Sequence, residues 1–154
     1  MSSTSTTTYD WYEKKFNEYS EKFDLSFDET LEDVALDNVR LKDALKSQLK
    51  LQLIYESMHN KVKHLYDMLK DEVDTKYSEA ISVELRDSYR DTTITEAKEY
   101  AKGNKEYRKY KRLLLDVSAL KDDTQTAVET VNSRKYILNN LTNAVVSANE
   151  NHLL

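Results

Sequence analysis

The apolar positions of this 154-residue chain recur every three or four residues, which is the spacing of one face of an α-helix. The pattern is longest in the second half of the chain, where it alternates steps of four and three without a slip. We call these positions the C-terminal seam: Leu113, Val117, Leu120, Thr124, Ala127, Val131, Arg134, Leu138, Leu141 and Val145. A seam of this period is typical of helices that pack along one another. We therefore expect residues 94–147 to form one helix or a helix pair.

Two more periodic segments precede the seam. The first places five rings on one face of a helix over residues 9–23: Tyr9, Tyr12, Phe16, Tyr19 and Phe23. We expect this face to dock on the rest of the domain or on a neighbouring subunit. The second predicts a long helix over residues 27–78, with these apolar positions: Leu51, Tyr55, Met58, Val62, Leu65 and Leu69.

Local signals set the expected boundaries. Ser26 with Glu29, and Thr93 with Glu96, each match the capping box that opens a helix. Residues 79–93 have no helical period, so we predict a loop there, and residues 1–8 read as a flexible polar tail. Gly103 marks either a break or a place where another group approaches the backbone.

Composition narrows the fold class. The chain has one glycine and no proline, and 33% of its residues are charged. Glycine and proline, on which tight turns and hairpins commonly depend, are therefore almost absent. We predict an elongated all-α protein of three to four helices, with a single domain over residues 9–154 and a heptad-like C-terminal helix that mediates oligomerisation.

Charge is spread unevenly along the chain. The net charge is -5, yet residues 98–112 hold seven basic side chains and three tyrosines against two glutamates. Cations neutralise phosphates and tyrosine rings stack on unpaired bases, so the segment suits single-stranded nucleic acid. Five of the cations form one stripe if the helix continues through Gly103. The candidate binding residues are Lys98, Lys102, Lys105, Tyr107, Arg108, Lys109, Lys111 and Arg112. The alternative is a solvated basic helix face.

Catalytic chemistry finds little support in the sequence. A single glycine excludes a glycine-rich phosphate loop, and no cysteine is present for a thiolate site. Glu56 and His59 match the Glu-x-x-His motif of di-iron bundles, but that site needs a second copy. We therefore expect no enzyme activity, no metal and no cofactor. No apolar run is long enough to span a membrane, and the chain fits a reducing cytoplasm.

Two seam positions, Thr124 and Arg134, are polar. A polar residue in a heptad seam often fixes register and oligomeric state, so Arg134 either specifies an assembly or lays its methylenes on the seam and reaches water. The candidate oligomerisation residues are Leu113, Val117, Leu120, Val131, Arg134, Leu138 and Leu141.

From about residue 20 to 147 the chain resembles the UvsY-type recombination mediators of tailed bacteriophages. The matching stretches are residues 28–34 (DETLEDV), 65–77 (LYDMLKDEVDTKY), 94–100 (ITEAKEY) and 131–140 (VNSRKYILNN). The resemblance implies a non-enzymatic helical protein that forms ring-like homo-oligomers through its C-terminal helices, with Arg134 in the assembly. It also implies binding to single-stranded DNA and the loading of a RecA-like recombinase, in recombination and repair, with displacement of the single-strand-binding protein. Such a protein would act in the cytoplasm, that of the host if a phage encodes it.

The chain departs from the family at one place. After the long helix the family carries a basic cluster and a turn with glycine, whereas residues 71–74 (DEVD) are acidic and 76–80 (KYSEA) lack the glycine. This moves the expected DNA path to residues 98–112. The competing hypothesis is a coiled-coil structural or chaperone-like adaptor that binds no nucleic acid, which the net charge favours.

Overall fold

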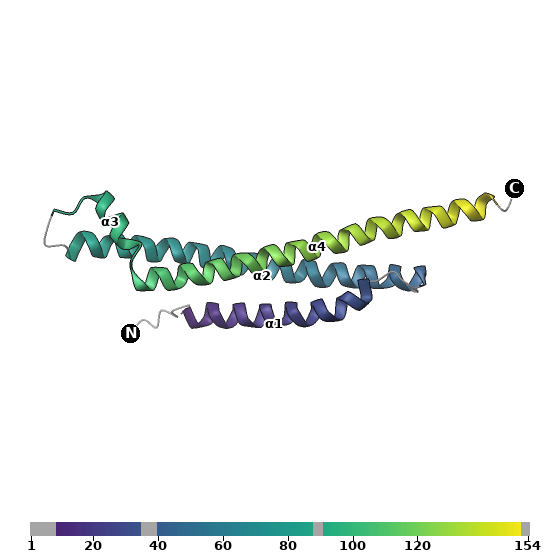
Figure 1. Ribbon diagram of the computed structural model, residues 1–154, viewed down its shortest axis with the longest axis horizontal. Helices are drawn as coiled ribbons and strands as arrows, with labels where there is room; N and C mark the ends of the chain where they lie inside the picture. The colour runs from purple at the N-terminus through teal and green to yellow at the C-terminus, as the bar shows by residue number, and fades with distance from the viewer. Residues whose placement is uncertain (1–8, 35–39, 88–90, 152–154) are drawn as a thin grey trace, which may run out of the picture. The chain divides into compact units, whose positions relative to one another are not determined.

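The computed structural model describes residues 9–34, 40–87 and 91–151. These residues form four α-helices and no strand, which confirms the all-α prediction (Figure 1). Three of the helices are long, as expected from a chain with one glycine and no proline. Their bounds are α1 Tyr9–Val34, α2 Leu41–Asp87, α3 Ile94–Ala101 and α4 Lys105–Asn151.

Several predicted boundaries differ from those of the structure. The helices predicted over residues 9–23 and 27–78 do not meet near Ser26: α1 continues to Val34, so Ser26 does not open a helix, and α2 begins only at Leu41. Residues 79–87 are helical rather than a loop, because α2 extends to Asp87. No proline or glycine stands in either stretch to end a helix. The polar tail predicted at residues 1–8 lies outside the described residues.

The second capping box is confirmed. Thr93 is the N-cap of α3: its hydroxyl accepts from the Glu96 backbone N–H, and its own backbone N–H donates to the Glu96 carboxylate at 2.9 Å. These bonds satisfy amide groups that the first turn of a helix leaves without partners. They also lower the pKa of Glu96, chiefly through the backbone N–H of Thr93.

The chain divides into two compact units, to which α1, α2 and α4 each contribute. The first unit combines Met1–Glu18 with Val62–Lys121, and the second combines Tyr19–Lys61 with Asp122–Leu154. In both units a segment of α4 packs against a segment of α2 that runs in the opposite direction. The contacting pairs show the antiparallel direction. In the first unit, for example, Tyr77 of α2 meets Tyr107 of α4, while Tyr66 of α2 meets Lys121 further along α4.

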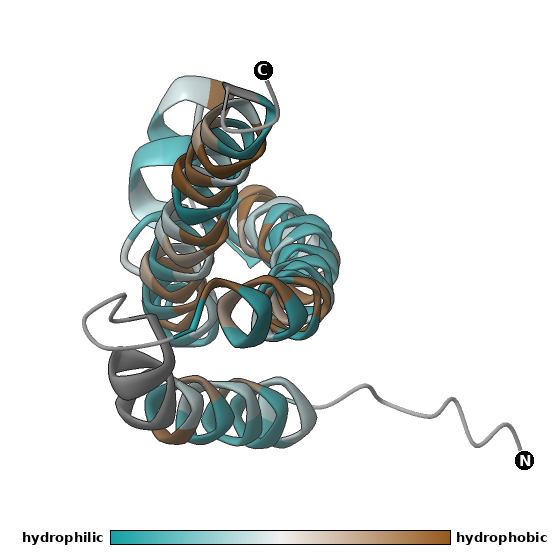
Figure 2. Cartoon of the chain, turned by 90° about the vertical axis from the view of Figure 1, so that its right-hand side faces the viewer, coloured by the Kyte–Doolittle hydropathy of each residue, from teal (hydrophilic) through white to brown (hydrophobic). Residues whose placement is uncertain are grey.

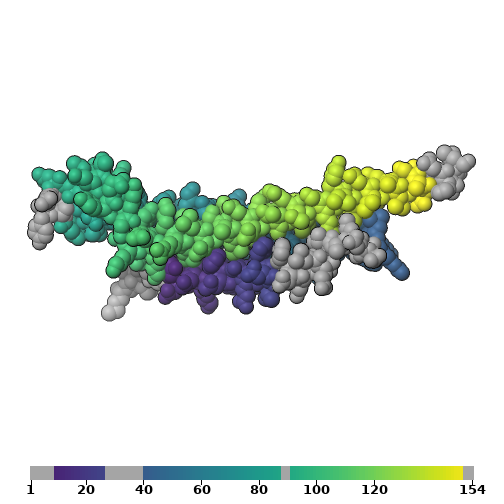
Figure 3. All heavy atoms as spheres, viewed as in Figure 1, coloured from purple at the N-terminus to yellow at the C-terminus, as the bar shows by residue number. Residues whose placement is uncertain are grey.

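In the first unit, aromatic and cationic side chains join three helices. The Lys121 ammonium lies 4.3 Å from the Tyr66 ring centroid, and the Tyr77 and Tyr107 rings are 5.1 Å apart. The first turns of α1 pack on α4, where Tyr9 meets Tyr110 edge to face at 5.5 Å. Figure 3 shows this contact as the purple start of α1 against the green part of α4. The aromatic face of α1 therefore docks within the chain.

The second unit pairs polar groups as well as rings. Phe23 meets Tyr55 edge to face at 6.4 Å, and the Tyr55 hydroxyl donates to the Ser26 carbonyl at 3.2 Å. A ring nitrogen of His59 lies 3.0 Å from the Thr124 hydroxyl. That contact places both groups in the interface of α2 and α4, so His59 has a structural partner.

The buried positions form narrow stripes on long polar helices. Figure 2, coloured by hydropathy, shows short hydrophobic stretches in brown alternating with hydrophilic ones in teal along the helices. The predicted seam of α2 is buried apart from Met58, which is half-buried. The C-terminal seam is buried from Leu113 to Leu138, apart from half-buried Ala127, and then becomes exposed at Leu141 and Val145. Most side chains of the C-terminal seam are therefore buried by packing within a single chain.

Candidate nucleic-acid interface

The helix does not continue through Gly103, so the basic stripe predicted from Lys98 to Arg112 is not one line. The Gly103 backbone N–H donates to the Tyr100 carbonyl at 3.0 Å as α3 ends. Asn104 then opens α4, because its side-chain oxygen accepts from the Tyr107 backbone N–H at 3.1 Å. An asparagine in this position is a favourable N-cap. Lys98 and Lys102 therefore belong to a different helix from the other cations.

Four of the predicted cations do share one face of α4. Lys105, Arg108, Lys109 and Arg112 follow one another at steps of three, one and three, which places them on one side of a helix. All four are exposed, on the side opposite the buried Tyr110. Among the described residues, Lys105, Arg108 and Arg112 form no ion pair. We call these four residues the α4 basic face.

The α4 basic face lies where a helix tolerates cations least. The N-terminal end of an α-helix carries partial positive charge, so an exposed cation in the first turn costs about 0.3–1 kcal/mol, and the cost falls off beyond that turn. Lys105 is the first residue of α4, and Arg108 is the fourth, where the first turn ends. The same placement adds the helix dipole to the cationic side chains, which raises the local positive potential.

Three of the predicted lysines have side-chain partners within the chain, whereas Lys98 on α3 is exposed. The Lys109 ammonium lies 3.8 Å from the Tyr9 ring centroid, and the Lys111 ammonium donates to the Tyr107 hydroxyl at 3.3 Å. Lys102 forms an ion pair with Glu99 at 2.7 Å, and this hydrogen bond and charge raise the pKa of Lys102. These contacts leave Lys105, Arg108 and Arg112 as the cations best placed for phosphate.

The tyrosines separate into packed and exposed side chains. Tyr110 is buried, and burial raises its pKa while the nearby Lys76 opposes that change. Tyr107 is half-buried against Tyr77. Tyr100, on α3, is 63% exposed and is the most accessible ring within residues 98–112. The sequence relates Tyr100 to Tyr107 by a seven-residue step, and only the helix break at Gly103 distinguishes them.

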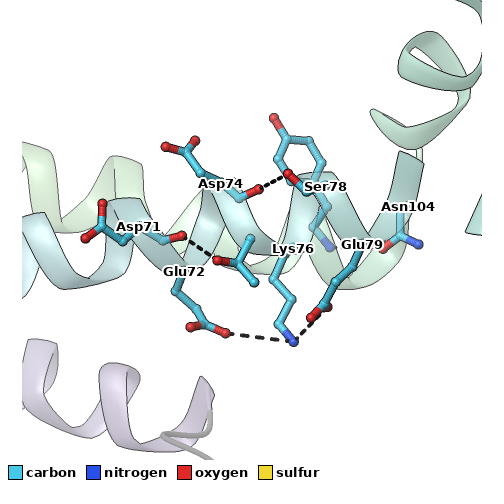
Figure 4. A network of polar contacts seen from close by, with 9 residues as sticks. Asp71, Glu72, Asp74, Lys76, Ser78, Glu79 and Asn104 are labelled. Carbon is cyan, nitrogen blue, oxygen red and sulfur yellow. Dashed lines mark hydrogen bonds and ion pairs between the residues drawn. The ribbon is translucent and has the colours of Figure 1, made fainter. Parts of the chain in front are cut away.

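The acidic segment of α2 lies on the same unit as the α4 basic face. Figure 4 shows Lys76 between Glu72, at 3.8 Å, and Glu79, at 3.4 Å. Burial alone would lower the pKa of Lys76, but the Glu79 carboxylate, with Tyr110 and Glu72, raises it. Asp71 and Asp74 are exposed nearby. This side of α2 offers phosphate little attraction, in keeping with the departure from the family in residues 71–80.

Arg134 lies in the second unit, and the structure contradicts the interpretation in which its side chain reaches water. It is 4% exposed, so its guanidinium does not reach water. Nη1 donates to the Gln48 side chain at 2.8 Å and to the Ala44 carbonyl at 3.3 Å, and Nη2 donates to the Ser47 hydroxyl at 3.1 Å. Gln48 also donates to the Val131 carbonyl at 2.7 Å. Arg134 therefore joins α4 to α2 within one chain.

Most of the residues predicted to mediate oligomerisation are, like Arg134, buried within the single chain. Their side chains are buried within the single chain and present no surface to a second copy while α2 and α4 stay paired: Leu113, Val117, Leu120, Val131, Arg134 and Leu138. Leu141 is the exposed member of the set.

No family model, curated protein or solved structure matches this chain. In the described part of the chain, no three His, Asp or Glu side chains gather as metal ligands do. No described helix combines the length and the apolar character needed to cross a bilayer.

Proposed function

We propose that this protein binds single-stranded DNA through the α4 basic face. The observation that carries the proposal is the exposure of Lys105, Arg108 and Arg112 on one side of α4, without an ion pair to any described residue. Acids three or four residues away can balance the charge of exposed cations on a helix. Phosphates of a nucleic-acid strand would supply that balance and release counterions.

The preference for a single strand rests on an exposed ring that is close to the basic face in sequence. Tyr100 is exposed on α3, two residues before the turn that leads into α4. Base stacking on an aromatic side chain contributes about 1–3 kcal/mol per base and needs an unpaired base. A duplex would use the cations but not the ring. The basic face and Tyr100 together therefore favour single strands.

The role of recombination mediator follows from the resemblance to the UvsY-type family. On that basis the protein helps to load a RecA-like recombinase and to displace the single-strand-binding protein, without enzymatic activity of its own. The acidic first part of the chain is the surface we assign to those protein partners. A ring-like homo-oligomer would present several basic faces to one strand and gain avidity. Since most of the seam is buried, such a ring would need other surfaces.

Fluorescence anisotropy with labelled oligothymidylate tests the proposal. We expect binding that weakens about tenfold or more in the variant K105A/R108A/R112A, because three cations no longer pair with phosphates. The matched control is K63A/K70A/K135A, which removes three exposed lysines from other surfaces. It should bind like the wild type. A duplex of the same length should bind more weakly than the single strand.

Three results would contradict the proposal. Unchanged affinity in K105A/R108A/R112A would place the DNA elsewhere. Equal losses in both triple variants would show that net charge alone governs binding. No binding at low salt, where electrostatic attraction is strongest, would favour the helical adaptor instead.

A further inference from the structure

The second unit has an exposed apolar row that the proposed DNA-binding function does not use. Leu45, Leu49 and Leu53 follow one another at steps of four on α2, so they lie along one side of the helix over about 12 Å. Their exposed fractions are 39%, 63% and 60%. Single exposed leucines are common, whereas a continuous row marks an interaction surface.

A lysine row runs beside the leucines. Lys42, Lys46 and Lys50 also follow steps of four, and each lies one position after or three before a leucine of the row. All three are exposed, and none forms an ion pair with a described residue. We call the leucine and lysine rows together the α2 outer face. It lies opposite the side that carries the buried Ala44, Gln48, Leu51 and Tyr55.

The leucine row ends in a groove. A concave space of about 360 Å³ lies between α1 and α2, and Leu53 belongs both to its lining and to the row. Ile54 and Met58 add apolar surface, while Lys61 on α2 and Lys22 on α1 contribute basic side chains. The groove therefore repeats the chemistry of the α2 outer face, apolar with a cationic border.

We propose that the α2 outer face and its groove bind an acidic amphipathic segment of a partner protein. Apolar side chains of such a segment would cover the leucines and enter the groove, and its carboxylates would pair with the lysines. This is the way in which amphipathic helices occupy apolar grooves. The acids among these residues are few, Asp43 and Glu56, and Glu56 already accepts a hydrogen bond from Gln52 at 2.9 Å.

Three other occupants fit the surface less well. A nucleic-acid strand would pair with the lysines but leave the leucine row in water. A bilayer surface would meet the lysines but could not fill a concave groove. A second copy bound by the same face would bring lysine rows together, and like charges would repel. Charge and shape together thus select an acidic apolar peptide. The inference does not depend on the proposed DNA binding.

A synthetic peptide tests this proposal with the full-length protein. The probe is a labelled helical peptide with leucines at every third or fourth position and glutamates between them. A shuffled peptide of the same composition is the control. We expect the helical peptide to bind in a salt-sensitive way, and the shuffled one to bind at least about tenfold more weakly.

Surface variants locate the site. L49S/L53S should weaken peptide binding about tenfold, since these leucines would form the centre of the contact. L115S is the matched control, because Leu115 is also 63% exposed but lies on α4 in the first unit. K46E/K50E should weaken binding as well, and K63E/K70E should not. Circular dichroism and thermal melting should show that each variant stays folded, since all these positions are exposed.

Other outcomes would overturn the proposal. Equal binding of both peptides, or unchanged binding in L49S/L53S, would exclude a specific site. Binding of phosphatidylcholine–phosphatidylglycerol vesicles but not of the peptide would make the face a lipid site. Competition by oligothymidylate that disappears in K46E/K50E but not in K105A/R108A/R112A would assign the face to DNA. Self-association that is abolished in L49S/L53S would make a second copy the occupant.

Discussion

At the scale of residues, Arg134 shows how a polar seam position fixes helix pairing. Its guanidinium bonds to Ala44, Ser47 and Gln48, all on one turn of α2. Those groups meet Arg134 in only one register of α4 against α2. The seam itself offers apolar contacts at every heptad, which a shift of seven residues would largely restore. The buried hydrogen bonds therefore select one register among several.

Replacing Arg134 should cost stability. We expect Arg134→Ala to lower the free energy of unfolding by about 2–4 kcal/mol, because it leaves the Gln48 amide buried without its partner and opens a cavity. Lys135→Ala, one residue on and exposed, should change it by less than about 0.5 kcal/mol. Urea unfolding followed by circular dichroism measures both. Equal, small effects would show that the guanidinium bonds do not hold the register.

Glu96 should make the start of α3 sensitive to acid. Its folded pKa is lowered from the ordinary value of 4.5, mainly by the Thr93 backbone N–H. A lowered pKa means that the contribution to stability is fully present above about pH 4.5 and is lost as pH falls through the folded value. Carboxyl chemical shifts followed by NMR should give a midpoint below 4.5, and the Thr93 amide should titrate with it. A midpoint at or above 4.5 would contradict the capping box.

At the scale of elements, sequence reasoning located the helices better than their ends. The seams of α2 and α4 were predictable, because burial follows a period that the sequence displays. The continuity of α1 past residue 23 was not, since Ser26 and Glu29 match a capping box by type while the helix passes through them. The cap at Asn104 was missed, although an asparagine directly after the only glycine is a recognisable signal. Which cations are exposed together depends on that cap, so the site could be predicted only in part.

The Asn104 cap can be tested directly. Asn104→Ala should lower the free energy of unfolding by about 1 kcal/mol, because the Tyr107 N–H loses its acceptor. Asn143→Ala is the contrasting change. Asn143 lies exposed within the last third of α4, where alanine is the better helix former, so stability should stay the same or rise by about 0.5 kcal/mol. A similar loss in both variants would show that Asn104 does not act as a cap.

At the scale of the whole molecule, a protein with net charge -5 is proposed to bind a polyanion. Net negative charge and polyanion binding are compatible because salt screens charges beyond about 10 Å at 0.1 M ionic strength. Phosphates on the α4 basic face would therefore respond to nearby cations more than to distant acids. Ten acids in residues 1–37, against three lysines, account for a large part of the negative charge.

The salt dependence of binding separates local pairing from net charge. Each phosphate neutralised on a single strand contributes about -0.7 to the slope of log affinity against log salt concentration, so three cations predict a slope of about -2. K105A/R108A/R112A and K63A/K70A/K135A both lower the net charge from -5 by three, to -8. If local pairing decides, only the first variant flattens the slope, towards zero, and R112A alone reduces it by about 0.7. If net charge decides, both triple variants change affinity alike. Anisotropy titrations from low to physiological salt distinguish these cases. Each cation removed from the α4 basic face means that one counterion fewer is released on binding, and no distant lysine can compensate for that loss.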